Sequence, residues 1–147
     1  MDKLAVKKYL EKLQNEICVT LSSADKNSFL ADRWERAEGG GGESRLFSNG
    51  SFIEKGGVNF SHVFGNSIPA AATIKRPELV GAAWEAMGVS VVIHPSNPHV
   101  PTVHMNVRFF SARKGDTDIW WFGGGYDLTP FYGYEAVSYT HLTLPTT

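Results

Sequence analysis

The most informative residues of this sequence are three polar side chains at every second position: His104, Asn106 and Arg108. Side chains alternate between the two faces of a β-strand, so a strand over this segment places all three on one face. An imidazole can carry a proton near neutral pH, and an amide beside a guanidinium can bind a carboxylate. The pattern favours a face that binds a carboxylate-bearing ligand and transfers a proton, with a solvated strand face as the simpler alternative.

A second strand-like run precedes this one and ends in another histidine. Ser90 and His94 share one face of residues 89–94, and a proline-containing loop separates this run from residues 102–110. A hairpin around that loop brings His94 and His104 toward each other. Two such imidazoles can bind a divalent metal or transfer a proton, although a metal requires further ligands from elsewhere.

Glycines and a carboxylate follow the aromatic run at residues 119–122. Three glycines, 123–125, allow the backbone to approach a flat, bulky ligand closely. Asp127 then lies at the end of a strand, where functional carboxylates are common, although a turn aspartate that caps Thr129 explains it equally well. The earlier glycine run, 39–42, lacks the Gly-Lys-Ser/Thr ending of a phosphate loop, so nucleotide binding is not expected.

The elements that must position these residues are a helix followed by short strands. An apolar stripe at steps of three and four predicts an N-terminal helix that ends at residues 22–25, with Cys18 as a core or boundary residue. Asn49-Gly50 is a strong hairpin signal and predicts tightly turned strands over residues 44–64. A Pro near its start and a Gly at its end favour a second helix over residues 76–87. The stripe consists of Val6, Leu10, Leu13, Ile17 and Leu21.

The remaining segments predict an antiparallel arrangement. Residues 39–42 are expected to interrupt regular structure, and residues 119–122 to form a buried strand that the following glycines close. Connections of hairpin length dominate from residue 44 onward, which favours antiparallel pairing over a doubly wound parallel sheet. The predicted fold class is α+β.

Composition excludes several classes of protein. The chain has 147 residues and a formal net charge of −1, whereas nucleic-acid and membrane-surface binding need a basic excess. No run of about 18 apolar residues exists, so no membrane insertion is expected. The N-terminal segment shows no targeting signal, and a single cysteine excludes an intramolecular disulfide framework. These features predict a globular protein of a reducing compartment.

A series of motifs resembles the oxygen-dependent coproporphyrinogen III oxidase family, and the similarity extends from residue 4 to Glu135. Long motifs in a fixed order are specific to one family. They are Gly-Gly-Gly-Glu-Ser-Arg (40–45), Glu-Lys-Gly-Gly-Val-Asn-Phe-Ser (54–61), Arg-Pro-Glu-Leu (76–79), Ala-Met-Gly-Val-Ser (86–90), Ile-His-Pro-x-Asn-Pro (93–98), Val-Pro-Thr-Val-His-Met-Asn-Val-Arg (100–108) and Trp-Trp-Phe-Gly-Gly-Gly-x-Asp-Leu-Thr-Pro (120–130).

The resemblance implies a late step of haem biosynthesis in the cytoplasm. The propionates on rings A and B of coproporphyrinogen III are oxidatively decarboxylated to the vinyl groups of protoporphyrinogen IX. Dioxygen is the oxidant in this family, carbon dioxide and hydrogen peroxide are released, and no organic redox cofactor takes part. An electron-rich porphyrinogen reacts with dioxygen itself, so the protein must supply orientation, proton transfer and exclusion of water.

The resemblance also implies an architecture and an assembly. The expected fold is a large, flat antiparallel sheet with helices on both faces, incomplete in this chain. The expected assembly is a homodimer, and some members of the family bind a divalent metal cation. A segment implicated in dimer contact matches residues 52–61, represented by Phe52, Glu54, Lys55, Val58 and Ser61.

Particular residues match the functional positions of the family. His104 matches the proposed proton donor, and Asp127 matches an aspartate that faces the pyrrole nitrogens. His94 and His104 match two of the histidines assigned as metal ligands in some members. The substrate-binding positions match Ser90, Asn106, Val107 and Arg108.

The chain departs from the family in length and at its C-terminus. It is much shorter than the family's chains, so further metal histidines, a second substrate-binding segment and most of the dimer interface are expected downstream. Residues 137–147 resemble the translation of a sequencing-library adapter. We therefore expect residues 1–135 to be the N-terminal part of one oxidase domain, inactive alone, and residues 136–147 to be a non-native tail.

Two other functions stay open on the residues alone. A non-catalytic binding module for tetrapyrroles or other polycarboxylates would bind porphyrin and consume no oxygen. A metal-dependent hydrolase centred on His94 and His104 would need a metal and no oxygen, and no other residue of the sequence was identified as its third ligand.

Overall fold

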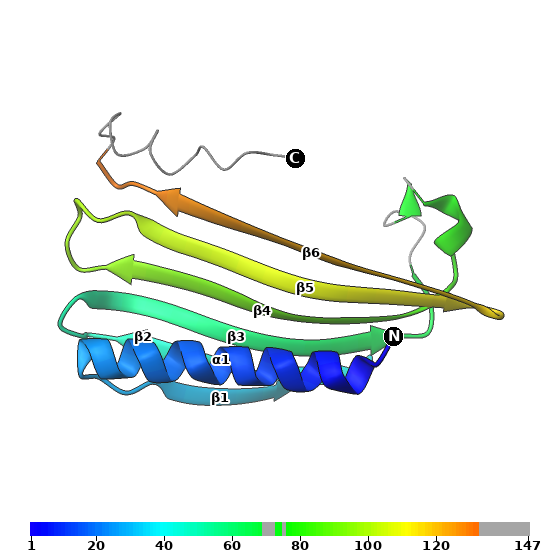
Figure 1. Cartoon of the computed structure of the whole chain (residues 1–147), viewed down its shortest axis with the longest axis horizontal. Coiled ribbons are helices and arrows are strands. Elements are labelled where there is room, and N and C mark those ends of the chain that lie inside the picture. Colours follow the sequence, from blue (N-terminus) through cyan, green and yellow to red (C-terminus); the bar gives the residue numbers. More distant parts are fainter. Residues whose placement is uncertain (69–72, 75, 133–147) are drawn as a thin grey trace.

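The computed structural model describes residues 1–68, 73–74 and 76–132, which form a long helix against an antiparallel sheet (Figure 1). Six strands follow one another across the sheet in chain order, and every neighbouring pair is antiparallel, as predicted. The elements are α1 (Lys3–Asp25), β1 (Leu30–Glu35), β2 (Gly40–Ser48), β3 (Ile53–Gly65), the 3-10 helix η2 (Pro77–Leu79), β4 (Ala83–Pro95), β5 (Thr102–Lys114) and β6 (Thr117–Thr129).

Helix α1 forms where the apolar stripe predicts it. Asp2 caps its N-terminus by accepting a hydrogen bond from the Ala5 amide at 3.0 Å, and Lys26 ends it in the left-handed conformation. Leu10 is buried and the other stripe residues pack against the same core. The helix therefore attaches to the sheet through the side that its sequence pattern selects.

The main core lies between α1 and one face of the sheet, which we call the helix-covered face. Figure 1 shows α1 lying lengthwise along the sheet, and it contacts β3 and β4. Cys18 is fully buried here, so it is a core residue. The strands contribute Phe47, Ile53, Val58, Phe60, Met87, Val89, Val91, Ile93 and Phe109.

The opposite face is covered only at one end within the described residues. There the connection between β3 and β4 packs its apolar side chains on the sheet, and the Trp84 ring stacks on Phe110 with planes 5° apart. Since α1 is the one α-helix of the described residues, helices on both faces are not confirmed by them. This cluster comprises Ile68, Leu79, Ala82, Ala112, Trp84, Phe110, Ile119 and Trp121.

The hairpin predicted at Asn49-Gly50 is confirmed and joins β2 to β3. Asn49 adopts the left-handed conformation with φ of 58°, and the Gly50 amide donates to the Ile53 carbonyl oxygen at 2.9 Å. The buried carboxylate of Asp25 accepts from the Phe52 amide at 2.7 Å. The last residue of α1 thereby fixes this turn to the helix.

The helix predicted over residues 76–87 is wrong. Residues 77–79 form only the short η2, and the chain enters β4 at Ala83. Met87 is buried in the main core and Trp84 stacks across the sheet, so tertiary packing overrides the local helix preference. The strand predicted over residues 89–94 is longer than expected for the same reason.

Two expectations about glycines are also wrong. Glycines 40–42 continue β2, and glycines 123–125 continue β6. A side chain at Gly42 would collide with the Trp34 ring, so glycine there permits the close packing of β1, a strand that no sequence pattern predicts. Residues 119–122 do form part of a strand, but they are not buried, since Phe122 is 58% exposed.

Glu43 on β2 forms ion pairs with Arg33 on β1 and with Arg45 on its own strand, and these pairs predict a pH-dependent stability. Its carboxylate accepts from Arg33 Nε and Arg45 Nε, both at 2.7 Å. The hydrogen bond from Arg33, followed by that from Arg45, lowers the pKa of Glu43 below its ordinary value. We expect Glu43→Gln to lower the free energy of unfolding by about 1 kcal/mol at pH 7.

The pKa of Glu43 is lower in the folded state than in the unfolded state. Its ion pairs therefore contribute fully to the free energy of unfolding above the unfolded-state pKa of about 4.3, and this contribution is lost as the pH falls through the folded-state pKa. Urea unfolding at pH 7 and at pH 3 measures the free energy of unfolding of the parent and of Glu43→Gln. The difference between the two proteins should be smaller at pH 3 than at pH 7. Glu54→Gln, at an exposed position on β3, is the matched control. An equal gap at both pH values would contradict the assignment.

Candidate functional site

The register of the sheet gathers the predicted site residues on the face opposite to α1. Residues directly opposed on neighbouring strands share a face. Asn106 is opposed by Ser90 on β4 and by Gly125 on β6, and Ser90 is opposed in turn by Asn59 on β3. The polar face, as we call it, comprises Asn59, Ser61, Ser90, His94, His104, Asn106, Arg108 and Asp127.

His104 and Asp127 form an exposed pair at the β6 edge of the polar face. They are directly opposed on β5 and β6, and their Nδ1 and Oδ1 atoms lie 2.9 Å apart. Thr129 also donates to Asp127 Oδ1, at 3.1 Å. The hydrogen bond from His104, supported by that from Thr129, holds the pKa of the Asp127 carboxyl below its ordinary value. An ionised carboxylate at neutral pH can orient the imidazole and stabilise its protonated form.

The pair was not predicted, although the sequence contains a signal for it. A tight turn at residues 115–116 joins β5 to β6, and Lys114 pairs with Thr117 across it. Counting outward equally along both strands from this turn brings His104 opposite Asp127. Asp127 therefore lies within β6 and is hydrogen-bonded to both His104 and Thr129. The alternative prediction, a turn aspartate that only caps Thr129, is wrong.

Arg108 is an exposed cation held by a neutral partner. Its Nη2 and Nε donate to Asn106 Oδ1 at 2.7 and 3.2 Å, and within the described part of the chain it forms no ion pair with a carboxylate. Gly88 and Gly123 flank it on the two neighbouring strands, so no side chain covers it from either side. The guanidinium is thus positioned to bind the carboxylate of a ligand in its planar fork.

A hollow of about 360 Å³ lies in the polar face beside Arg108. Gly88 at its floor replaces a side chain that would press on Arg108 and on the Val107 carbonyl oxygen. Side chains with hydrogen-bonding groups surround it on three strands. They are Asn59 and Ser61 of β3, Ser90 of β4, and Asn106 and Arg108 of β5.

The hairpin that was predicted to bring the two histidines together is confirmed, but it does not join them. His104 opposes Val92, so His94 lies one step further along the same face. His94 Nδ1 is 3.3 Å from Thr102 Oγ1, whereas His104 Nδ1 faces Asp127. No group of three or more His, Cys, Asp or Glu side chains that fits a metal ion occurs among the described residues. These residues alone do not build a metal site.

The other predicted residues lie in different surroundings. Val107 points to the helix-covered face and packs against the main core, and Val58 is fully buried in that core. Ser61 lines the hollow of the polar face. Phe52, Glu54 and Lys55 are exposed near the hairpin that leads into β3. A role of the 52–61 segment in dimer contact stays a prediction.

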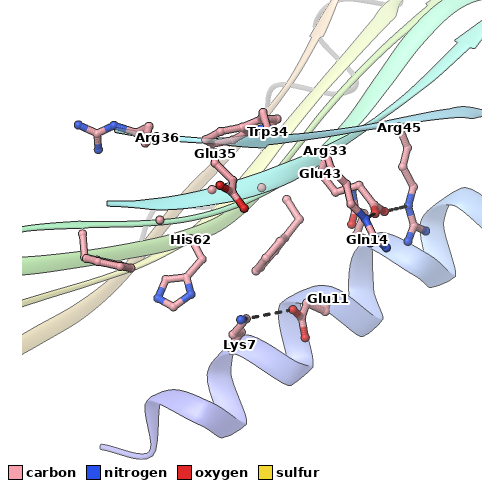
Figure 2. A pocket seen from close by; sticks show the side chains of 15 residues that line it. Lys7, Glu11, Gln14, Arg33, Trp34, Glu35, Arg36, Glu43, Arg45 and His62 are labelled. Carbon is pink, nitrogen blue, oxygen red and sulfur yellow. Dashed lines mark hydrogen bonds and ion pairs between the residues drawn. The ribbon is translucent and has the colours of Figure 1, made fainter. Parts of the chain in front are cut away.

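A second cleft, of about 850 Å³, lies on the helix side between α1 and the strands (Figure 2). Its charged side chains are largely paired with each other, as Lys7 is with Glu11 and as Arg33 and Arg45 are with Glu43. His62 on its wall is 2.7 Å from Glu85 on the neighbouring strand β4. These groups stabilise the structure, so the cleft is a weaker candidate than the polar face.

The family model described as Coproporphyrinogen III oxidase matches residues 5–145 of the chain. The match contains every residue of the polar face and also residues 136–145 of the predicted tail. Residues 133–147, and with them the whole predicted tail, lie outside the described residues. In addition, no described helix is long and apolar enough to cross a bilayer.

Proposed function

Because this chain belongs to the coproporphyrinogen III oxidase family, we propose that it carries the substrate-binding and proton-transferring face of an oxygen-dependent enzyme of haem biosynthesis. The observation that supports this best is the hydrogen-bonded His104–Asp127 pair on the same face as Arg108, whose guanidinium forms no ion pair among the described residues. A proton carrier and a carboxylate receptor on one open face suit a flat substrate that bears propionates.

Each decarboxylation needs an electron pair to leave the substrate. The propionate side chain loses carbon dioxide and a hydride equivalent from the carbon next to the pyrrole, which leaves a vinyl group. Dioxygen accepts the hydride equivalent and one proton and becomes hydrogen peroxide. This balance needs no organic redox cofactor, and we propose none. The protein's task is to hold the propionate, supply the proton and limit the access of water.

The polar face divides these tasks between its residues. Arg108, positioned by Asn106, binds a propionate carboxylate, and Ser90 supplies a hydroxyl on the neighbouring strand. His104 supplies the proton, and Asp127 holds its imidazole in place. We route no step through a divalent cation, because His94 and His104 have separate partners and bring no third ligand.

We further propose that the enzyme is a cytoplasmic homodimer and that the N-terminal part needs the family's C-terminal half for activity. An exposed apolar groove of about 990 Å³ between α1 and strands β5 and β6 supports this need. Activity is therefore tested on a completed chain, which we define as residues 1–135 joined at Glu135 to the C-terminal half of a coproporphyrinogen oxidase.

Arg108→Ala is the test of substrate binding. We expect the KM of the completed chain for coproporphyrinogen III to rise by roughly 10-fold to 100-fold, with kcat little changed. The carboxylate contact exists in the ground state and in the transition state alike, so its loss weakens both equally. Steady-state rates, followed by porphyrin fluorescence after oxidation of the product, give both constants.

Arg113→Ala is the matched control, because this arginine lies on the same strand but outside the polar face. It should leave both constants unchanged. An Arg108 variant with an unaltered KM would show that the substrate does not bind on this face.

A further inference from the structure

One buried atom of the polar face has no hydrogen-bond partner among the described residues: the side-chain oxygen Oδ1 of Asn59. Buried polar groups are nearly always hydrogen-bonded, and an exception calls for a missing partner. Asn59 is on β3, two strands away from Asn106 and Arg108. It lies within the 52–61 segment that is predicted to take part in dimer contact, and it is not one of the residues that match substrate-binding positions.

The position of Asn59 connects this atom to the candidate site. It faces Ser90 directly across β3 and β4, and Ser90 faces Asn106 across β4 and β5. These three side chains form one continuous row of hydrogen-bonding groups across the sheet. Asn59 and Ser61 also form the β3 side of the 360 Å³ hollow whose other side is Arg108. Asn59 therefore lines a ligand-sized space, and its unpartnered oxygen lies beside the open position of Gly57 on the same face.

We propose that Asn59 Oδ1 accepts a hydrogen bond from a pyrrole N–H of the substrate, an inference that rests on the function proposed above. The unpartnered atom is an acceptor, so it requires a donor. Ionised propionates offer only acceptors, and the pyrrole N–H groups are the donors that a porphyrinogen offers. Asn59 thus recognises the macrocycle itself, whereas Arg108 recognises its carboxylates.

The spacing of the strands is compatible with one substrate reaching both residues. Neighbouring strands lie about 4.8 Å apart, so β3 and β5 are separated by roughly 10 Å. A pyrrole nitrogen and the end of a propionate on the same macrocycle are separated by a comparable length of substrate. Around Asn59 and Arg108, several positions of the polar face are glycines and have no side chain, which leaves room for a broad ring system. These positions are Gly57, Gly88 and Gly123.

The test compares two ligands that carry the same four propionates. Coproporphyrinogen III, kept under nitrogen, has pyrrole N–H groups, whereas zinc(II) coproporphyrin III has none. We expect Asn59→Leu to weaken binding of coproporphyrinogen III by roughly tenfold and to leave binding of the zinc porphyrin unchanged. Asn59→Asp keeps an acceptor at the same place and should retain binding of coproporphyrinogen III. Anaerobic equilibrium dialysis with the completed chain measures all affinities.

Two controls make the outcomes distinct. Ser44→Ala changes the next residue of the same row, on β2 and outside the hollow, and should alter neither affinity. Arg108→Ala should weaken both ligands alike. Equal weakening of both ligands by Asn59→Leu, no weakening by it, or loss of coproporphyrinogen binding in Asn59→Asp would each overturn the inference. A parent chain that binds neither ligand would overturn the proposed function and the inference with it.

Discussion

His104→Ala is expected to lower the kcat of the completed chain by roughly 100-fold or more while KM changes little. Among the described residues of the polar face, the His104 imidazole is the one that a carboxylate fixes, at 2.9 Å from Asp127, and an imidazole is a common general acid and base. Its loss removes proton transfer in the transition state, whereas the carboxylate contact at Arg108 stays. Steady-state kinetics in air measure both constants.

Two further variants separate proton transfer from shape. His104→Gln can keep a hydrogen bond to Asp127 but cannot carry a proton, so its kcat should fall as far as that of the alanine variant. His99→Ala changes a histidine in the turn between β4 and β5 and should leave kcat unaltered. Full turnover in either His104 variant would remove the imidazole from the mechanism.

Removal of dioxygen is expected to abolish turnover of the completed chain altogether. The electron pair released with each carbon dioxide has no other acceptor in the proposed reaction. Neither a nicotinamide nor a flavin should restore activity under nitrogen, and readmission of air should restore it in full. The measurement is formation of protoporphyrinogen IX in parallel anaerobic and aerobic samples.

Treatment with a chelator in air tests the role of the histidines in the same assay. His94 and His104 have separate hydrogen-bonding partners in the structure, and we expect activity to survive exhaustive chelation. Loss of activity that returns with a divalent cation would show that residues beyond the described part complete a metal site. Turnover that persists under nitrogen would contradict the oxygen-dependent assignment.

The two faces of the sheet explain why the sequence predicts the site better than its surroundings. Period-two alternation sends His104, Asn106 and Arg108 to one face and Met105, Val107 and Phe109 to the other. The polar side chains could be selected from this alternation alone. One face is needed for the core beneath α1, so the functional groups are left on the other.

Local patterns predict an element well where the local and tertiary preferences agree. The stripe of α1 and the turn at Asn49-Gly50 are of this kind. The segment before Gly88 is not, because Trp84 and Met87 are held in β4 by partners on other strands, which no local pattern contains. The missed strand β1 likewise depends on the packing of Trp34 over Gly42.

The pairings across strands are the part of the site that local reading misses. His104 meets Asp127, and Asn59 meets Ser90, through the register of separate strands. A two-residue turn fixes the first of these pairings and could have revealed it. The second pairing follows a longer connection between β3 and β4, so it cannot be found by counting residues outward from a tight turn.

The most direct test of the proposed function is the identity of the product formed by the completed chain in air. Chromatography with mass spectrometry should show coproporphyrinogen III converted to protoporphyrinogen IX, with two carbon dioxide molecules released per substrate and hydrogen peroxide formed. The Arg108 and His104 variants should form this product more slowly. Coproporphyrinogen III that binds but is recovered unchanged in air would contradict the proposal and would identify the polar face as a binding surface without catalysis.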